Sequence, residues 1–177
     1  MAKKPKADLA TLAAHLIVFS DRVAGGTKED RTTGRATDLL RSAGITQVHV
    51  TITPENPQAL RQAIAIARRS HTPLPTRLII VFGGTGFARG NVTPEIVREH
   101  IEVEIPGIAE QIRAYGLKNT PLSGLSRSVV GVTSREPGAA IVVASPGSPG
   151  GAEDTLAVLL PLLPAIIDQL DEERSGV

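Results

Sequence analysis

An apolar run, a glycine-rich segment and a helix start follow one another in the middle of this chain. Leu78–Phe82 holds five consecutive apolar residues, three of them β-branched, which predicts a strand covered on both faces. Gly83-Gly84-Thr85-Gly86 then lets the backbone turn sharply and bring its N–H groups close to a ligand. Thr93-Pro94-Glu95 predicts a helix start capped by the Thr93 hydroxyl. This order is typical of anion sites in α/β proteins, although a turn that merely uses convenient glycines is the simpler alternative.

Composition indicates one soluble domain with an aliphatic core. The 177 residues are 41% hydrophobic but include no Trp, one Tyr and three Phe. A net charge of +1 and few aromatic residues argue against nucleic-acid binding. The lack of cysteine excludes disulfides, and the four histidines lack metal-site spacing. No apolar run approaches membrane-spanning length, so we expect a cytoplasmic protein without membrane contact.

The first half of the chain has a β-α-β-α-β pattern. Strands are expected at Ala14–Phe19, Gln47–Thr53 and Leu78–Phe82. The two helices between them carry apolar residues at helical spacing, namely Ala36, Leu39, Leu40 and Ala43 in one, and Leu60, Ala63, Ile64 and Ala67 in the other. The pattern predicts a three-layer α/β/α fold with a mostly parallel sheet.

The second half adds helices and an antiparallel hairpin. Short helices are expected at Pro94–Ile101 and along Ile108, Ile112 and Tyr115. The turn sequence Ser134–Gly138 joins two strand-like runs, Arg127–Thr133 and Ala139–Ala144. Pro161 and Pro164 should kink or split the last helix. We expect a flexible basic tail at 1–13, one domain at 14–171 and a frayed end at 172–177.

Three loops should meet at one edge of the sheet. Ser20–Gly26, Gly83–Asn91 and Ser145–Gly151 each follow the carboxyl end of an expected strand. If these strands are parallel, the loops line one polar crevice. Side chains near it that can hold Mg²⁺ or phosphate are Asp21, Asp30, Glu55, Glu95, Arg22, Arg89 and Arg127. Taken singly, such residues are more often caps or surface groups.

Other phosphate and nucleophile motifs are absent. The chain has no Walker P-loop, and no G-x-G-x-x-G opens a helix. Gly124–Ser128 approaches the hydrolase nucleophile elbow but lacks its last glycine and precedes a strand, so its serines are interpreted as turn or ligand-binding hydroxyls.

The segment Gly83–Glu95 resembles a family signature. It is similar to G-G-T-G-x-x-x-x-D-V-T-P-E of the molybdopterin-binding MogA/MoaB family. Further similarities follow in family order over about residues 14–170, at Ser20–Arg22, Glu104–Gly107 with Glu110 and Arg113, Leu125–Arg127, and Pro146–Pro149.

The resemblance implies a role in molybdenum-cofactor synthesis. It implies that the chain binds molybdopterin, transfers AMP from Mg-ATP to it and releases pyrophosphate, as a homotrimer or a hexamer. The implied catalytic residues are Asn91, Glu55 and Asp21, of which Asn91 and Glu55 are candidate Mg²⁺ ligands. The implied substrate-binding residues are Ser20, Gly83, Gly84, Thr85, Gly86, Ser126, Arg127, Pro146, Gly147 and Ser148.

Three departures from the family pattern leave alternatives open. Asn91 stands where the family has aspartate, Glu55 matches a second acid with a longer reach, and Gly150 replaces a frequent lysine. A pterin-binding or scaffold protein with weak or no transferase activity is therefore the second hypothesis, ahead of a generic phosphosugar- or nucleotide-binding domain. We also expect a bulky residue in place of Gly84 to abolish binding while leaving the fold intact.

Overall fold

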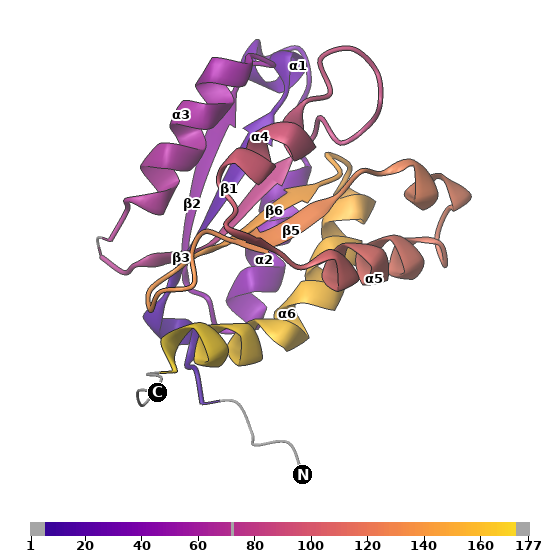
Figure 1. Cartoon of the computed structure of the whole chain (residues 1–177). Coiled ribbons are helices and arrows are strands. Elements are labelled where there is room, and N and C mark those ends of the chain that lie inside the picture. Colours follow the sequence, from indigo (N-terminus) through magenta and orange to yellow (C-terminus); the bar gives the residue numbers. More distant parts are fainter. Residues whose placement is uncertain (1–5, 72, 173–177) are drawn as a thin grey trace.

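The computed structural model describes residues 6–71 and 73–172, which form a mixed sheet of six strands (Figure 1). The strand order is β2-β1-β3-β6-β5-β4. The strands are β1 (Ala13–Phe19), β2 (Gln47–Thr53), β3 (Thr76–Phe82), β4 (Val103–Glu104), β5 (Val129–Val132) and β6 (Ile141–Ser145). The four strands β2, β1, β3 and β6 are mutually parallel, whereas β5 runs antiparallel to both of its neighbours. The mostly parallel sheet and the hairpin predicted from the sequence are confirmed.

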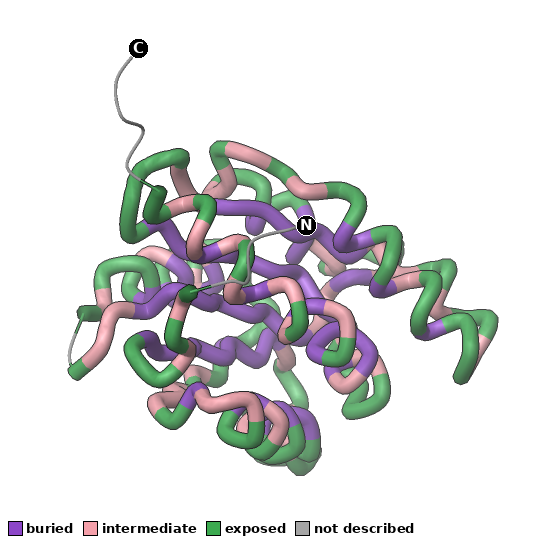
Figure 2. The backbone as a smooth tube through the Cα atoms, turned by 90° about the horizontal axis from the view of Figure 1, so that it is seen from below, coloured by how far each residue is buried: buried purple, intermediate pink, exposed green. Residues whose placement is uncertain are grey.

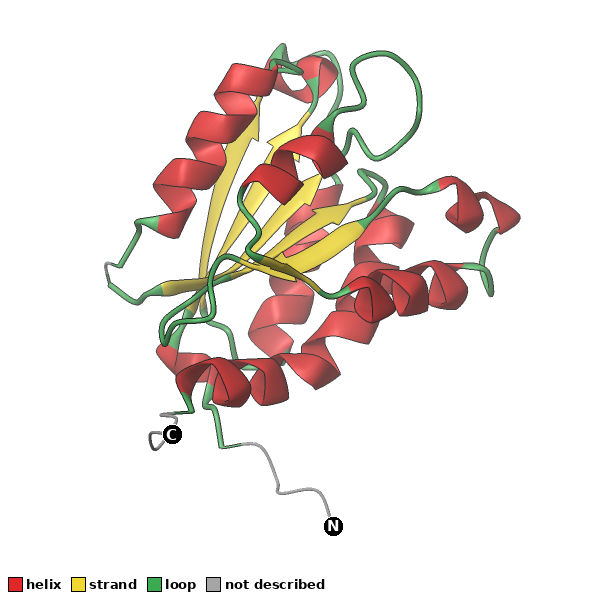
Figure 3. Cartoon of the chain, in the orientation of Figure 1, coloured by secondary structure: helices red, strands yellow, loops and turns green. Residues whose placement is uncertain are grey.

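Helices cover both faces of this sheet (Figure 3). They are α1 (Asp21–Ala24), α2 (Thr32–Ser42), α3 (Pro57–Arg68), α4 (Thr93–Glu99), α5 (Pro106–Gly116) and α6 (Pro149–Asp171), with short 3-10 helices η1 (Leu9–Thr11) and η2 (Pro121–Leu125). One core cluster joins α2, α5 and α6 to the sheet through residues such as Leu40, Ile112 and Leu159. A second cluster joins α3 and α4 to the opposite face through Ile64 and Ile96. The three-layer α/β/α prediction is therefore confirmed.

The central strands are buried, as their apolar composition predicts. All seven residues of β1 and all seven of β3 are buried, as expected for strands covered on both faces. Figure 2 shows these buried strands between helices that are exposed on their outer sides. At the carboxyl edge, Phe82 pairs with Val18 of β1 and with Ser145 of β6. The three strands therefore end side by side, and the loops that follow them begin at one place.

Helix α1 and strand β4 are among the short elements that were not predicted. Helix α1 spans four residues and strand β4 two, and neither length carries a usable hydrophobic period. Strand β5 begins at Val129 rather than at Arg127, because the N–H of Arg127 turns away to the carbonyl of Thr85 at 2.9 Å. These differences change the edges of the sheet but not its layers.

The last helix is continuous through both prolines, so of the two predicted outcomes, a kink or a split, the split is wrong. Figure 1 shows its axis turning in the second half, where it passes beneath the sheet. Pro161 and Pro164 cannot donate to the carbonyls of Ala157 and Leu160. Ala157 is exposed and Leu160 is half-buried, so water can satisfy both carbonyls.

Helix α6 also corrects the expectation that no apolar run reaches membrane-spanning length. Its 23 residues are long and apolar enough to cross a membrane by length and composition alone. In the structure, however, α6 packs against α2, α5 and the sheet through Leu156, Leu159, Leu163 and Ile167. This is the placement of a core helix.

Three local expectations also need correction. Thr93 does not cap α4, because Val92 occupies the cap position and the Thr93 hydroxyl is buried without a hydrogen-bond partner among the described residues. Tyr115 remains 38% exposed instead of lining the buried side of α5. Within the expected tail 1–13, Leu12 is buried and Ala13 already belongs to β1, whereas residues 1–5 lie outside the described residues, as do 173–177 of the expected frayed end.

Candidate functional site

A crevice of about 650 Å³ opens at the carboxyl edge of β1, β3 and β6. The loops after these three strands line it, together with the segment that leads into α2. Polar and glycine residues make up most of its wall, namely Ser20, Arg22, Lys28, Glu29, Asp30, Arg31, Thr32, Glu55, Gly83, Gly84, Thr85, Gly86, Asn91, Gly147 and Ser148. The expectation that the three loops share one crevice is confirmed.

Gly83 and Gly84 build the floor of this crevice, and their φ angles are +102° and +66°. A Cβ atom on Gly83 would lie 2.7 Å from the carbonyl oxygen of Phe19, so the backbone of β1 leaves no room for a side chain. A Cβ atom on Gly84 would collide with the hydroxyl of Thr93 and lie 2.8 Å from the ring of Phe19. The expectation that a bulky residue at position 84 leaves the fold intact is therefore wrong.

The loop backbone offers donors to a bound anion. Among the described residues, the N–H groups of Gly84, Thr85 and Gly86 have no protein acceptor. Unpaired N–H groups facing a crevice are the usual backbone component of phosphate sites. The glycines thus let the loop pack closely on β1 and leave its main-chain N–H donors available.

The start of α6 and the residues just before it also line the crevice. A Cβ atom on Gly147 would lie 3.0 Å from the Cα atom of Gly83, so the two glycine loops touch backbone to backbone. Ser148 caps the helix by accepting from the N–H of Gly151 at 3.1 Å. Thr32 donates to the carbonyl of Gly147 at 2.9 Å and ties α2 to the same loop. A capped helix start beside glycine N–H groups favours a negatively charged ligand.

The cations of the crevice come from the segment between β1 and α2. Arg22, Lys28 and Arg31 line the wall, whereas Arg89 does not. Arg31 forms an exposed ion pair with Glu29 at 3.0 Å, which contributes little in water. Arg22 and Lys28 have no ion pair among the described residues. They are therefore free to meet a polyphosphate.

Two expected acids have structural partners. Asp21 accepts from the N–H of Glu55 at 2.7 Å and braces the loop after β2. Asp30 accepts from the N–H groups of Thr32 and Thr33 at 3.0 and 3.1 Å, so it caps the start of α2. Asp21 does not line the crevice, whereas Asp30 does.

The crevice suits a metal that arrives with its ligand better than a resident one. Within residues 6–71 and 73–172, no group of three or more His, Cys, Asp or Glu side chains could hold a metal. Glu55 and Asn91 bring one carboxylate and one amide oxygen to the wall. Magnesium carried on phosphates keeps several waters and needs only one or two protein oxygens, so these residues fit Mg²⁺ bound to a nucleotide.

Asn91 lines the crevice at the end of the glycine-rich loop. Its Nδ2 atom donates to the carbonyl of Ala88 at 3.2 Å, and its own N–H donates to the same oxygen at 3.1 Å. A Cβ atom built on Gly86 would lie 3.4 Å from Oδ1 of Asn91. The side chain thus has a fixed orientation, with Oδ1 toward Gly86.

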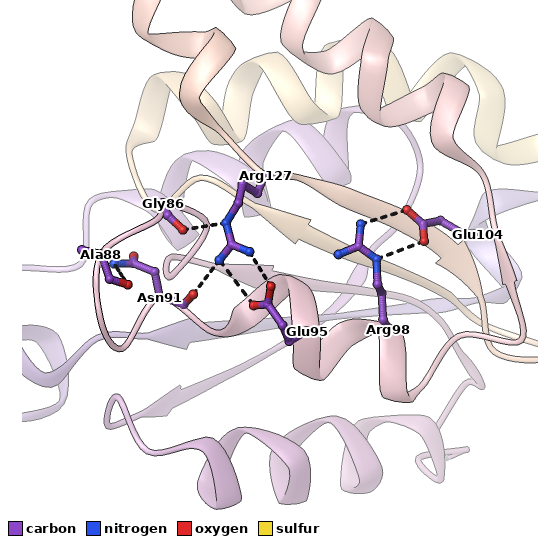
Figure 4. A network of polar contacts seen from close by, with 7 residues as sticks. All are labelled: Gly86, Ala88, Asn91, Glu95, Arg98, Glu104 and Arg127. Atoms are coloured by element: carbon purple, nitrogen blue, oxygen red, sulfur yellow. Dashed lines mark hydrogen bonds and ion pairs between the residues drawn. The ribbon is translucent and has the colours of Figure 1, made fainter.

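Arg127 lies between this loop and Glu95 of α4 (Figure 4). The guanidinium donates to the carbonyls of Gly86 at 2.8 Å and Asn91 at 2.6 Å, and it forms an ion pair with Glu95. The hydrogen bond to Arg127 holds the pKa of the Glu95 carboxyl below its ordinary value, against the opposing effect of partial burial.

The structure thus sorts the candidate site residues into two groups. Ser20, Glu55, Asn91, Gly147, Ser148 and the segment Gly83–Gly86 line the crevice. Asp21, Ser126, Arg127 and Pro146 lie outside its wall, and the Ser126 hydroxyl pairs with that of Ser128 at 2.9 Å. Sequence reasoning did not single out Lys28, Glu29, Arg31 or Thr32, although the polar stretch between the first strand and first helix was the available signal.

A parallel α/β sheet with glycine loops and a helix start at one carboxyl-edge crevice defines a class of phosphate-ligand binding proteins. Comparison with known proteins identifies the family within this class. Residues 15–165 match the family described as "Probable molybdopterin binding domain", and the chain belongs to this family.

The similar proteins carry names from molybdenum-cofactor synthesis. A molybdenum cofactor biosynthesis bifunctional protein of Synechococcus elongatus is 35% identical over 162 residues, which cover 90% of this chain and 48% of the relative. The chain therefore spans about half the length of that relative. The molybdopterin adenylyltransferase of Escherichia coli is 30% identical over 148 residues, 82% of this chain and 72% of the enzyme.

Solved structures agree with the assignment. A molybdenum cofactor biosynthesis protein from Corynebacterium diphtheriae, described as putative, superposes with a TM-score of 0.80 at 34% identity. The match covers 91% of this chain and 99% of that one. The α/β fold and the family are thus established together.

Proposed function

We propose that this protein binds molybdopterin and transfers AMP to it from ATP, with release of pyrophosphate, as a step of molybdenum-cofactor biosynthesis. The observation that carries the proposal is the crevice itself, which is lined both by Gly84–Gly86, whose N–H groups have no protein acceptor among the described residues, and by Gly147 and Ser148 at the start of α6. Such a site suits two phosphate-bearing substrates at once. The name of the Escherichia coli relative supports this reaction.

The reaction needs positioning and charge neutralisation more than covalent chemistry. A phosphate oxygen of molybdopterin forms a bond to the α-phosphorus of ATP, and the bond between that phosphorus and the bridging oxygen to the β-phosphate breaks. The N–H groups of the glycine loop hold phosphate oxygens. Arg22 and Lys28 neutralise the polyphosphate that departs as pyrophosphate.

Magnesium is expected to enter with ATP, where it neutralises phosphate charge. Glu55 and Asn91 are the residues that would contact it. Asp21 contributes indirectly, because its hydrogen bond to the N–H of Glu55 fixes the backbone of that loop.

Asn91 is expected to make the transfer slow. An amide oxygen carries no net charge, so it holds a metal less firmly than a carboxylate of the same shape. This property also keeps open the second hypothesis, a pterin-binding or scaffold protein with weak or no transferase activity.

The test is to incubate the protein with molybdopterin, ATP and Mg²⁺ and to measure pyrophosphate. Release that requires both substrates supports the transferase. Tight molybdopterin binding without pyrophosphate release supports the scaffold, and binding of neither substrate contradicts both hypotheses.

We further propose that the protein works in the cytoplasm as a homotrimer or, through pairing of trimers, a hexamer. Several large apolar side chains near the end of α5 and in η2 support self-association, namely Tyr115, Leu117, Leu122 and Leu125, which are 38–67% exposed. Sedimentation that finds only monomer at micromolar concentration contradicts this proposal.

A further inference from the structure

Phe87 is the most exposed large apolar side chain among the described residues, at 77%. The other two phenylalanines of the chain, Phe19 and Phe82, are 2% and 1% exposed and pack beneath the crevice. A phenylalanine ring left in water gains nothing for the folded domain. The ring is therefore available for a contact with a bound molecule.

Phe87 lies in the loop between two residues of the crevice wall, Gly86 and Asn91. Gly86 and Asn91 both line the wall, and Phe87 directly follows Gly86, so its Cα atom is only about 3.8 Å from that of a wall residue. Arg127 ties together the two ends of this loop through the carbonyls of Gly86 and Asn91. The two ends of the loop are thus fixed by hydrogen bonds that do not involve the phenylalanine side chain.

The crevice wall lacks an exposed aromatic face among the described residues. Its only aromatic members are Phe19 and Phe82, whose rings are buried. The wall is otherwise made of glycines, short polar side chains and charges, which bind phosphates well and flat rings poorly. A substrate with a heteroaromatic ring would find its aromatic contact beside the wall, at Phe87.

We propose that the Phe87 ring stacks on the flat heteroaromatic ring of a substrate whose phosphates occupy the crevice. This inference rests on the proposed function, in which two such rings are available, the adenine of ATP and the pterin of molybdopterin. Offset stacking on a ring favours any flat heteroaromatic system, so the geometry assigns the chemistry and the experiment distinguishes the two sources.

The absence of tryptophan makes the test specific. Phe87→Trp introduces the only indole of the chain, and its fluorescence reports ring contact directly. ATP and molybdopterin are titrated separately, with inorganic tripolyphosphate as a ring-free probe. We expect saturable quenching by one of the two ring-bearing substrates and no response to tripolyphosphate. Ile66→Trp is the matched control, because Ile66 is 59% exposed on α3 and does not line the crevice, so its signal should not change.

A second variant measures the contribution to affinity. Phe87→Ala should weaken binding of the quenching substrate about tenfold by calorimetry, while tripolyphosphate binds as it does to the wild type. Phe87→Tyr retains the ring and should bind like the wild type.

Three results would overturn the inference. The first is that the wild type binds ATP and molybdopterin, Phe87→Ala binds both with unchanged affinity, and Phe87→Trp shows no quenching. This result removes the stacking role and leaves the proposed function in place. Dissociation of the oligomer by Phe87→Ala, without a change in affinity, assigns the ring to an interface between copies of the chain. Failure of the wild type to bind either substrate removes the proposed function and this inference with it.

Discussion

The Nε atom of Arg127 donates to the carbonyl oxygen of Gly86 at 2.8 Å, across 41 residues of sequence. The same guanidinium reaches the carbonyl of Asn91 at 2.6 Å and forms an ion pair with Glu95 at the start of α4. Arg127 therefore fastens both ends of the glycine-rich loop to the helix that follows it. The family resemblance implies that Arg127 binds substrate, and this contact set adds a role in positioning the loop.

Arg127→Lys should lower kcat/KM about tenfold or more. A lysine ammonium retains the charge opposite Glu95, but it cannot hold the carbonyls of Gly86 and Asn91 in the fixed fork of a guanidinium. Loss of either hydrogen bond lets the loop shift, and small shifts of positioning groups are costly in rate. Steady-state kinetics and thermal unfolding, measured together, check this prediction.

Arg98→Lys is the matched control. Arg98 makes a two-pronged contact with Glu104 at 3.1 and 3.2 Å on the same side of the sheet, without touching the loop (Figure 4). Its replacement should leave kcat/KM unchanged. Equal losses in the two variants would mean that Arg127 acts only through general stability.

Gly84→Ala should destabilise the fold, whereas Gly86→Ala should not. Gly84 has a φ of +66°, and its Cβ atom would meet Thr93 and Phe19, so the left-handed conformation alone costs about 1–2 kcal/mol. A loss of that size lowers Tm by roughly 2–8 °C in a domain of this length. The nearest atom to a Cβ on Gly86 is Oδ1 of Asn91 at 3.4 Å, an ordinary contact.

The Gly86→Ala variant therefore separates binding from folding. It adds one methyl group to the crevice wall beside Asn91, and its effect on substrate affinity can be measured in a folded protein. If Gly84→Ala has the same Tm as the wild type, the close approach of this loop to β1 does not restrict the side chain at position 84.

The sequence predicts the sheet well because its central strands are buried on both faces. The continuous apolar run of β3 permits few other structures, and the glycines after it mark the crevice. Two-residue β4 and four-residue α1 are stabilised by neighbours distant in sequence, so local pattern cannot reveal them. Pro161 suggests a break, but the exposed side of α6 accommodates the missing hydrogen bond.

The site is less predictable than the fold, because the same residue type can bind a ligand or brace a loop. Asp21 and Arg127 both look like ligand-binding groups in sequence. In the structure, however, each forms a hydrogen bond to a backbone group of another segment. Which role a carboxylate or guanidinium takes depends on contacts between segments, and sequence spacing does not contain them.

Acid should weaken the attachment of the C-terminal helix through Asp171. Arg77 is buried and donates to both carboxylate oxygens of Asp171 at 2.9 Å. This hydrogen-bonded pair, helped by the N–H of Gly138, lowers the pKa of Asp171 from its ordinary value of 3.8. A lowered carboxyl pKa stabilises the fold above the unfolded pKa, and the contribution is lost as the pH falls through the folded pKa.

The measurement is Tm against pH for the wild type and Asp171→Asn. The wild type should be the more stable at neutral pH, and the difference should shrink as the pH falls below about 4. Asp38→Asn removes an exposed carboxyl of α2 without a salt bridge among the described residues, and it should show no such convergence. A constant gap between wild type and Asp171→Asn at all pH values would contradict the ion-pair account.

Asn91→Asp should raise the rate of adenylyl transfer. The substitution places a charge where the family pattern has one, and about 1.4 kcal/mol of added transition-state stabilisation gives a tenfold gain. An aspartate cannot donate to the carbonyl of Ala88, so some loop order is lost in exchange. Initial rates of pyrophosphate release at saturating Mg-ATP decide the balance. Brisk wild-type turnover that stays unchanged or falls in the variant would show that Glu55 already supplies enough charge.

The direct test of the proposed reaction is to follow the phosphates of ATP separately. ATP labelled at the α-phosphate and ATP labelled at the γ-phosphate are each incubated with wild-type protein, molybdopterin and Mg²⁺, with the Escherichia coli adenylyltransferase as the positive control. Adenylyl transfer places the α-label on the pterin and the γ-label in pyrophosphate, in equal amounts. A γ-label on the pterin, or no label on it under conditions where the control enzyme reacts, would contradict the proposed transferase.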